Sequence, residues 1–407
     1  MSSIIHIKHP SKKISVSCTL PGSKSESNRA LIINKLSGNK IQIENISTSE
    51  DTQNLVRLLA SPYKNLDIKD AGTNMRFLTA YFCAINKNKI IEGSQRMQQR
   101  PVGKLVDALR AIGFKIYYVK NDGFPPVEII PSERLHLKYE VSVEANESSQ
   151  FISALLMIAP VFPDGLTIKL QKKIVSKPYI KMTLEIMKMC GIISSWKKDE
   201  IRIDHQKYQE TIYKVEPDWS AASYWYSIAA LSDGAQIELK GFKKKSLQGD
   251  QVIAEWMTNF GISTHYTDQG IIIKKESEPV SNEMDFDFTN NPDLAQTIIV
   301  LAAAKSINLK IKGLKTLRLK ETDRVVALKK ELRKIGAEFI QNKPDFFELK
   351  SNFKNPVERI ETYNDHRMAM AFAPLGIKNQ ITIIQPAVVT KSYPEFWQHL
   401  KSAGFET

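Results

Sequence analysis

The stretch Pro21–Arg29 combines hydroxyls and cations where a helix is expected to begin. It reads Pro-Gly-Ser-Lys-Ser-Glu-Ser-Asn-Arg and precedes the apolar run Ala30–Leu36. Serines cap helix N-termini, where backbone N–H groups are unpaired, and Lys24 and Arg29 add two positive charges there. A phosphate or carboxylate suits such a place, although Ser rather than Gly precedes Lys24, so this is not a Walker loop. This stretch alone leaves an anion site and a capped surface helix equally open.

Other apolar, helix-like runs also open on polar or charged residues. With the first stretch, the six openings are Ser-Glu-Ser-Asn-Arg29, Gly72-Thr-Asn-Met-Arg76, Ser148-Ser-Gln150, Asp218-Trp-Ser220, Pro292-Asp293 and Asp365-His-Arg367. Because the runs are apolar nearly all round, we expect these helices to be buried. Their N-termini would then converge on shared clefts, where their partial positive charges favour an anionic ligand.

Amphipathic segments alternate with these runs. Each has helical spacing up to a Gly, or to Ser-Pro in the first, and then a short strand-like run. We expect such segments at 52–68, 105–116, 184–193, 253–264, 328–339 and 396–405. Short strand-like runs fill the gaps. The simplest account is six α/β units of about 70 residues each. The sequence has no eight-fold βα period, which argues against a TIM barrel. It has no Gly-x-Gly-x-x-Gly after a strand, which argues against a dinucleotide-binding fold.

Length, cysteine content and charge bound the class of protein. The 407 residues, 42% of them apolar, predict a globular chain of two or three domains, without a membrane span or an apolar signal segment. Three widely spaced cysteines, Cys18, Cys83 and Cys190, are typical of a reducing compartment, so we expect a cytoplasmic protein. The net charge of +13 is scattered, with Lys243–Lys245 the densest cluster. A nucleic-acid binder usually concentrates its charge, and small anionic substrates explain the excess equally well, although a generally Lys-rich composition accounts for most of it.

Nine motifs in order give the chain a family resemblance. It resembles the enolpyruvylshikimate-phosphate synthases (3-phosphoshikimate 1-carboxyvinyltransferases) from about residue 20 to residue 397. The motifs are Pro-Gly-Ser-Lys24-Ser25-x-Ser-Asn-Arg29, Ala-Gly72-Thr73-x-Met-Arg76, Arg100-Pro-x-Gly, Ser148-Ser149-Gln150, Ser176-Lys-Pro-Tyr179, Pro292-Asp293, Lys320-Glu321-Thr-Asp-Arg324, Asn364-Asp-His366-Arg367-Met-Ala-Met and Lys391-Ser-Tyr-Pro.

The resemblance implies a fold and a reaction. The fold is a two-domain, inside-out α/β barrel of six βαβαββ units, with three units per domain. We expect the first domain at 21–215, the second at 1–20 plus 216–407, and the active site in the cleft between them. The reaction transfers the carboxyvinyl group of phosphoenolpyruvate to the 5-hydroxyl of shikimate 3-phosphate and releases phosphate. It serves the shikimate pathway to chorismate and aromatic amino acids, without metal or organic cofactor, and we expect a monomer.

The resemblance also assigns ligand-binding residues. Both substrates are anionic, which suits guanidinium and ammonium groups. The phosphoenolpyruvate site would comprise Lys24, Gly72, Arg100, Gln150, Arg324, Arg367 and Lys391. The shikimate 3-phosphate site would comprise Lys24, Ser25, Arg29, Ser148, Ser149, Gln150, Ser176, Asp293 and Lys320. Supporting residues would be Thr73, Arg76, Tyr179 and His366.

Asp293, Glu321 and Lys24 match the residues expected to move protons. One group must take the 5-hydroxyl proton and another must protonate the methylene carbon, and the family pattern makes Asp293 the acceptor and Glu321 the donor. The structural alternatives are a helix-capping role for Asp293 and an i+3 ion pair from Glu321 to Arg324. His366 is expected to orient neighbours rather than to bind a metal.

Three positions depart from the family pattern. Asp70 stands where many relatives have Asn, Phe77 where Pro is usual, and Thr316 where a substrate-contacting Asn is common. We hypothesise that these changes alter the response to glyphosate, a phosphoenolpyruvate competitor. Two other functions were weighed: the sister transferase that acts on a nucleotide sugar, and a basic protein that binds RNA or processes RNA ends. Ser25 argues against the first, since that family has Lys-Asn here, and the carboxylates Asp293 and Glu321 argue against the second.

Overall fold

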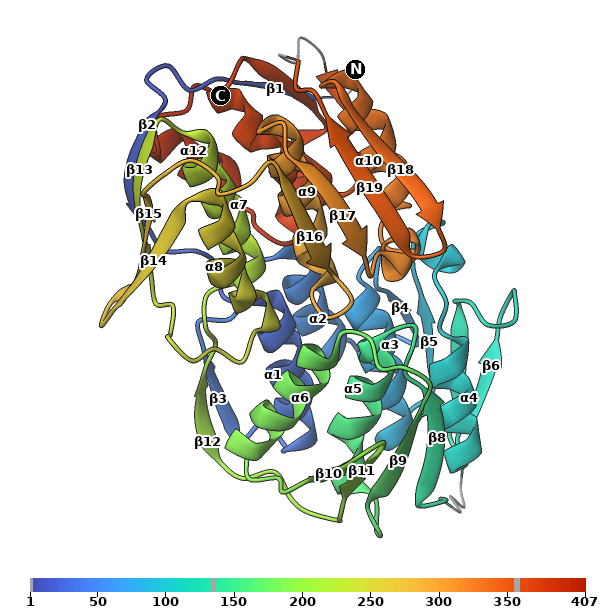
Figure 1. Ribbon diagram of the computed structural model, residues 1–407. Helices are drawn as coiled ribbons and strands as arrows, with labels where there is room; N and C mark the ends of the chain where they lie inside the picture. Colours follow the sequence, from blue (N-terminus) through green and yellow to red (C-terminus); the bar gives the residue numbers. More distant parts are fainter. Residues whose placement is uncertain (1–2, 133–136, 355–358) are drawn as a thin grey trace. The chain divides into compact units, whose positions relative to one another are not determined.

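The computed structural model describes residues 3–132, 137–354 and 359–407 and divides into two compact units (Figure 1). The terminal unit contains both chain ends and comprises Met1–Gly22, Thr48–Glu50 and Glu216–Thr407. The inserted unit comprises Ser23–Ser47 and Asp51–Val215. Each unit is built from α/β repeats, and each is described by itself below.

The inserted unit holds two complete repeats and one smaller repeat. The first repeat is β4 (Asn65–Asp67), α3 (Gly72–Ala84), β5 (Lys89–Glu92), α4 (Gly103–Ile112), β6 (Lys115–Tyr118) and β7 (Val127–Ile130). The second is β8 (Glu140–Glu144), α5 (Ser149–Ile158), β9 (Leu166–Gln171), α6 (Lys177–Met189), β10 (Ser195–Lys197) and β11 (Glu200–Ile203). The smaller repeat is α1 (Lys24–Leu36), β3 (Ile41–Glu44), α2 (Glu50–Leu59) and β12 (Thr211–Lys214).

The terminal unit repeats this plan. One repeat is β2 (Lys13–Cys18), α7 (Trp219–Leu231), β13 (Gly234–Lys240), α8 (Ile253–Trp256), β14 (Ile262–Thr267) and β15 (Gly270–Lys275). Another is β16 (Glu283–Asp287), α9 (Ala295–Ala304), β17 (Asn308–Lys312), α10 (Arg324–Lys334), β18 (Ala337–Lys343) and β19 (Phe346–Ser351). The last is β20 (Arg359–Ile360), α11 (His366–Phe372), β21 (Ile381–Ile384) and α12 (Phe396–Ser402), completed by β1 (Ile4–Ile7).

The four complete repeats share one sheet topology. In the sheet ordered β4-β5-β7-β6, the strands β4 and β5 run parallel, and β7 and β6 continue the sheet antiparallel. The sheets β8-β9-β11-β10, β2-β13-β15-β14 and β16-β17-β19-β18 follow the same order. Among the described residues the two smaller repeats form the sheets β12-β3 and β1-β21-β20. Six α/β units are therefore present, four of them with the full βαβαββ set.

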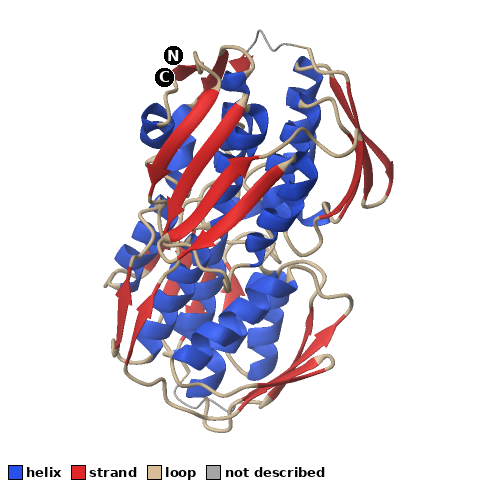
Figure 2. Cartoon of the chain, turned by 60° about the vertical axis from the view of Figure 1, so that its left-hand side comes forward, coloured by secondary structure: helices blue, strands red, loops and turns tan. Residues whose placement is uncertain are grey.

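Burial separates the two kinds of helix that the sequence predicts. All ten residues of α9 are buried, and α11 is buried throughout. By contrast, α4 buries one stripe, formed by Leu105, Val106, Ala108, Leu109 and Ile112. Figure 2 shows that in each unit helices gather inside and strands lie outside. The sheets therefore enclose a helical core, as expected for apolar helices.

Local signals place most helix ends correctly. The Ser23 side chain caps α1 and the Asp365 side chain caps α11, each accepting a hydrogen bond from the first turn. Gly336 follows α10 with φ of 84°, and a Cβ there would lie 2.4 Å from the carbonyl oxygen of Asn352. In the segment 253–264 the regular helix is short, because α8 covers four residues between two 3₁₀ turns, but Gly261 ends it with φ of 76° and β14 begins at Ile262, as predicted. There the Thr258 hydroxyl donates to the carbonyl of Glu255, a local bond that competes with a regular helix.

Candidate active site

Arg324 is the centre of a buried charge cluster in the terminal unit. It is the first residue of α10 and is 1% exposed. Its Nε donates to Asp365 Oδ2 at 2.6 Å, Nη2 to Glu321 Oε2 at 2.9 Å, and Nη1 to Asp293 Oδ1 at 3.3 Å. Burial alone would lower the pKa of Arg324, but the three carboxylates outweigh it and hold that pKa above its ordinary value. This guanidinium is a fixed cation that joins three separate loops.

Further cations surround the two predicted catalytic carboxylates. Arg367 Nη2 lies 3.1 Å from Asp293 Oδ2, and Arg367 Nη1 donates to the Asp293 carbonyl at 3.2 Å. Lys320 Nζ lies 3.8 Å from Asp293 Oδ1, and Lys391 Nζ lies 3.7 Å from Glu321 Oε1. The structure thus brings together all six predicted site residues of this unit that carry a full charge.

The cations determine the protonation state of Asp293. Burial would raise the pKa of this carboxyl, but Arg367, Lys320 and Arg324 outweigh burial and depress it far below its usual range. Asp293 lies in a 3₁₀ turn, Pro292–Leu294, directly ahead of α9, whose N-cap residue is Leu294. Glu321 does form the predicted i+3 ion pair with Arg324. Both carboxylates therefore lie in cationic surroundings suited to anionic ligands.

Asp250 is a member of this cluster that the motifs missed. It lies in a 3₁₀ turn, Gly249–Val252, and accepts from Ser220 Oγ at 2.5 Å and from Asn291 Nδ2 at 3.2 Å. Burial and the nearby charge of Asp293 raise its pKa to about 6. Through these bonds Asp250 connects the start of α7 to the turn that carries Asp293. The available signal was the turn Gln-Gly-Asp at 248–250, which the family motifs did not include.

His366 and Thr316 lie in the same unit. His366 is buried, with Nδ1 3.8 Å from Asp365 Oδ1, which fits a residue that orients a neighbour. Thr316 lies in the 3₁₀ segment Lys315–Leu319, and its hydroxyl oxygen is buried without a hydrogen-bond partner among the described residues. Within the described part of the chain, no cluster of three His, Cys, Asp or Glu side chains could hold a metal ion.

A second cluster lies at the helix starts of the inserted unit. Lys24, the first residue of α1, pairs with Asp51 Oδ2 at 3.0 Å. The amide of Asn28 donates to Thr73 Oγ1 at 2.8 Å and to Asn74 Oδ1 at 3.3 Å, which ties α1 to the start of α3. The predicted convergence of helix starts is therefore present within this unit. Asp51 was not predicted from the sequence.

Gly72 lies against two arginines. Arg76 Nη1 donates to the Gly72 carbonyl at 3.1 Å, and Arg100 Nη1 donates to the carbonyl of Asp70 at 2.8 Å. A Cβ at Gly72 would lie 2.6 Å from Arg100 Nη2 and 2.9 Å from Arg76 Nη1. The missing side chain at Gly72 therefore leaves the space that the Arg100 guanidinium occupies. The carboxylate of Asp70, the first departure from the family pattern, accepts from the hydroxyl of Ser94.

Arg29 is buried and links the helices α1, α5 and α6. Its Nε donates to Thr183 Oγ1 at 2.7 Å, Nη1 to the Ser25 carbonyl at 2.8 Å, and Nη2 to Ser153 Oγ at 3.2 Å. The guanidinium carbon also lies 5.3 Å from the ring centre of Phe77 and 6.0 Å from that of Tyr179. Burial lowers the pKa of Arg29 to about 10, so the side chain remains a cation at neutral pH.

The polar residues predicted to bind shikimate 3-phosphate open these same helices. Ser148 caps α5 through a bond from the Gln150 N–H at 3.3 Å, and Ser149 is the first residue of that helix. Ser176 precedes α6 with a left-handed φ of 53°. Arg29 thereby links the three helices whose first residues or N-caps include Ser25, Ser149 and Ser176.

Comparison with solved structures defines the class of protein. The fold matches EPSP synthase from Acinetobacter baumannii with a TM-score of 0.77 at 19% identity, covering 98% of this chain and 99% of the other. It matches the enolpyruvyl transferase NikO from Streptomyces tendae with a TM-score of 0.72 at 11% identity, covering 100% and 98%. The fold is that of the enolpyruvyl transferases, which confirms the predicted two-domain, inside-out α/β class.

Sequence comparison identifies the family within that class. Residues 56–400 match the family model described as EPSP synthase (3-phosphoshikimate 1-carboxyvinyltransferase). A 3-phosphoshikimate 1-carboxyvinyltransferase from Bacteroides fragilis (strain YCH46) is 46% identical over 97% of this chain and 96% of its own length. The protein of that name from Pseudoalteromonas translucida is 35% identical over 97% and 98%. The chain belongs to the EPSP synthase family.

Proposed function

We propose that this protein transfers the carboxyvinyl group of phosphoenolpyruvate to the 5-hydroxyl of shikimate 3-phosphate and releases phosphate. Family membership supports the reaction, and the observation that carries it is the pair Asp293 and Glu321, both bound to Arg324. This reaction requires carboxylates that can transfer protons and, next to them, cations that can bind an anionic substrate. A nucleotide-sugar acceptor and an RNA-related role are not favoured by the family match.

Phosphoenolpyruvate would bind to the predicted cations. We assign its phosphate and carboxylate to Arg100, Arg324, Arg367, Lys391 and Lys24, with Gly72 and Gln150 alongside. Guanidinium groups suit both anions because they form paired hydrogen bonds. We assign shikimate 3-phosphate to Lys24, Ser25, Arg29, Ser148, Ser149, Gln150, Ser176, Asp293 and Lys320.

The chemistry would run as addition followed by elimination. Asp293 takes the proton of the 5-hydroxyl, whose oxygen attacks C2 of phosphoenolpyruvate, while Glu321 delivers a proton to the methylene carbon. The tetrahedral intermediate then loses a methyl proton to a carboxylate and expels phosphate, which restores the double bond. Cations that neutralise the phosphate stabilise both steps. Lys24 is the third candidate for proton transfer.

Substrate binding would also prepare Asp293 as a base. Without substrate, three cations depress its pKa and make it a weak base. An incoming phosphate and carboxylate compete for Arg324 and Arg367, so the pKa of Asp293 rises towards the range useful for catalysis. The resting ion pairs therefore become ligand contacts as the reaction begins.

Phosphate release from phosphoenolpyruvate tests this proposal. We expect release to require shikimate 3-phosphate and to fall by at least about a hundredfold in Asp293→Ala and Lys24→Ala. Release with a nucleotide sugar instead would move the protein to the sister activity. Release that persisted in both variants would refute the residue assignments while leaving the reaction in place.

Two further properties complete the proposal. We infer a cytoplasmic enzyme, since all three cysteines are buried free thiols and the substrates are metabolites of biosynthesis. We also infer a monomer, which sedimentation equilibrium can test. None of the helices in the described residues is long and apolar enough to span a membrane.

A further inference from the structure

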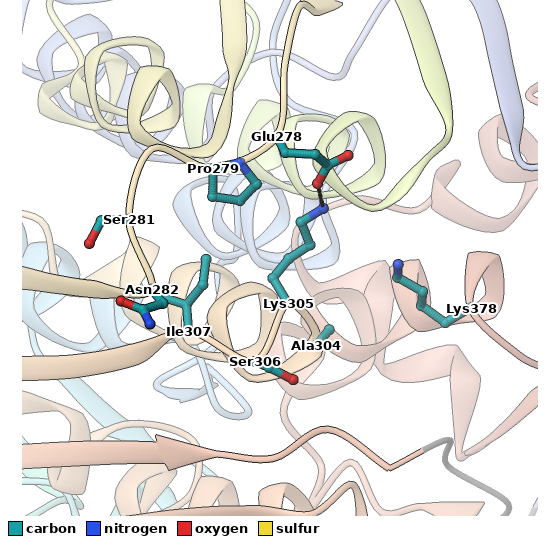
Figure 3. A pocket seen from close by; sticks show the side chains of 9 residues that line it. All are labelled: Glu278, Pro279, Ser281, Asn282, Ala304, Lys305, Ser306, Ile307 and Lys378. Atoms are coloured by element: carbon teal, nitrogen blue, oxygen red, sulfur yellow. Dashed lines mark hydrogen bonds and ion pairs between the residues drawn. The ribbon is translucent and has the colours of Figure 1, made fainter.

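A cationic pocket of about 330 Å³ lies in the terminal unit among residues that the proposed reaction does not use (Figure 3). Three segments line it: the loop between β15 and β16, the turn between α9 and β17, and the residue after the 3₁₀ segment Ala373–Ile377. The lining residues are Glu278, Pro279, Ser281, Asn282, Ala304, Lys305, Ser306, Ile307 and Lys378.

Lys305 and Lys275 are largely buried and share one carboxylate. Their side chains are 9% and 10% exposed, whereas the carboxylate partner, Glu278, is 66% exposed. Lys275 Nζ donates to Glu278 Oε1 at 2.6 Å and to the Ser232 carbonyl at 2.7 Å, and Lys305 Nζ pairs with Glu278 Oε2. Two ammonium groups are therefore held together by a single exposed side chain, which water can reach and a stronger anion can replace.

Lys378 adds a third cation to the pocket. Figure 3 shows its side chain beside Lys305. Within the described residues, its ammonium has neither a hydrogen-bond acceptor nor a carboxylate within 4 Å. Burial, together with the charges of Lys305 and Lys275, lowers the pKa of Lys378, while Asp233 and Glu278 act in the opposite sense. With these two carboxylates counted, the cluster keeps a net charge of +1.

We propose that this pocket binds a small molecule through a phosphate group, either a phosphomonoester or inorganic phosphate, held between Lys305 and Lys378. Displacement of the exposed Glu278 would leave three ammonium groups and Asp233, a net charge of +2, which favours a dianion. Phosphate is favoured over a carboxylate because the described lining contains no guanidinium for planar, paired hydrogen bonds, and ammonium groups bind phosphate as point charges. At the C-terminal end of α9, the N–H groups of residues 305–307 bond to the carbonyls of Leu301, Ala302 and Ala303.

Site-resolved lysine acylation of the full chain, read by mass spectrometry, tests the site directly. A bound phosphate should raise the pKa of Lys378 and cover its ammonium group, and so reduce its labelling by about fivefold or more. Inorganic phosphate and glycerol 3-phosphate are the probes, and the exposed Lys240 is the internal control. Because the readout is specific to Lys378, phosphate bound at Arg324 does not disturb it.

Two variants give opposite expectations. Glu278→Gln removes the competing carboxylate and should lower the phosphate concentration needed to protect Lys378. Lys378→Gln should abolish the protection of Lys305, and it keeps the test valid if Glu278→Gln folds poorly. Equal protection by sodium chloride at matched ionic strength would show simple screening and overturn the site. Equal protection by succinate would overturn the assignment to phosphate. Protection of Lys305 that persists in Lys378→Gln would overturn the claim that the two lysines hold one ligand.

Discussion

Asp365 holds Arg324 in place, and its replacement by Asn should be costly. The side chain is fully buried, accepts two hydrogen bonds from Arg324, and caps α11 by accepting from the Arg367 N–H at 2.9 Å. Asn keeps the cap but removes the charge, and breaking a buried ion pair costs about 3–5 kcal/mol. Since Arg324 keeps Glu321 and Asp293, we expect the lower end, about 3 kcal/mol.

Asp323→Asn is the matched control. Asp323 also caps a helix, α10, but its ion pair with Arg318 is partly exposed, at 33% and 38%. We expect a loss below about 1 kcal/mol, because Asn caps as well as Asp and exposed pairs contribute little.

Urea unfolding followed by tryptophan fluorescence measures the comparison, because four of the five tryptophans lie in the terminal unit. With a slope of about 2 kcal/mol per molar urea, the Asp365→Asn midpoint should fall by about 1.5 M. The affinity for phosphoenolpyruvate should fall as well, since Arg324 loses its anchor. Equal midpoints for Asp365→Asn and Asp323→Asn would refute the claim that the buried network stabilises this unit.

Three other predictions follow from single contacts. Gly72→Ala should displace the Arg100 guanidinium and raise the KM for phosphoenolpyruvate by about tenfold or more, whereas Gly234→Ala, which has open space around it, should leave KM unchanged. Because folding raises the pKa of Asp250 from 3.8 to about 6, its ionisation destabilises the native state as pH rises through that window; Asp250→Asn should therefore gain stability relative to the native chain between about pH 4 and pH 7 in urea titrations. Phe77→Pro should shift the glyphosate inhibition curve, because Phe77 packs on a site arginine, and superimposable curves would contradict this.

The repeats and the buried helices were predictable because their signals are local. Ser23, Ser148 and Asp365 precede apolar runs, and each caps the expected helix. A capping side chain and the residues it caps are neighbours in sequence, so their pattern survives without knowledge of the fold. In the segment 253–264 the apolar spacing correctly predicts helical residues up to Gly261, but it does not distinguish a regular α-helix from the four-residue α8 between 3₁₀ turns.

The partners of the site residues could not be predicted in this way. Lys24 pairs with Asp51, and Arg324 pairs with Asp365, across 27 and 41 positions of sequence. The chain has 44 acidic residues, and the sequence around any one of them does not show which cation it pairs with. Only the packing of helix starts selects the pair, and the functional roles of these residues remain predictions.

The resting structure also shows how a cationic site can be stable without its substrates. Four like charges, on Lys320, Arg324, Arg367 and Lys391, would repel one another if they were left without counterions. Asp293, Glu321 and Asp365 prevent this, but they differ in consequence: Asp365 is fully buried and pairs with the guanidinium from behind, whereas Asp293 and Glu321 retain some exposure. An anionic substrate can compete for the cations only where those two carboxylates hold them. In the proposed reaction, the same carboxylates would then be released from their ion pairs, with higher pKa values, when a proton must be moved. Stability of the empty site and timing of catalysis thus depend on one set of charges.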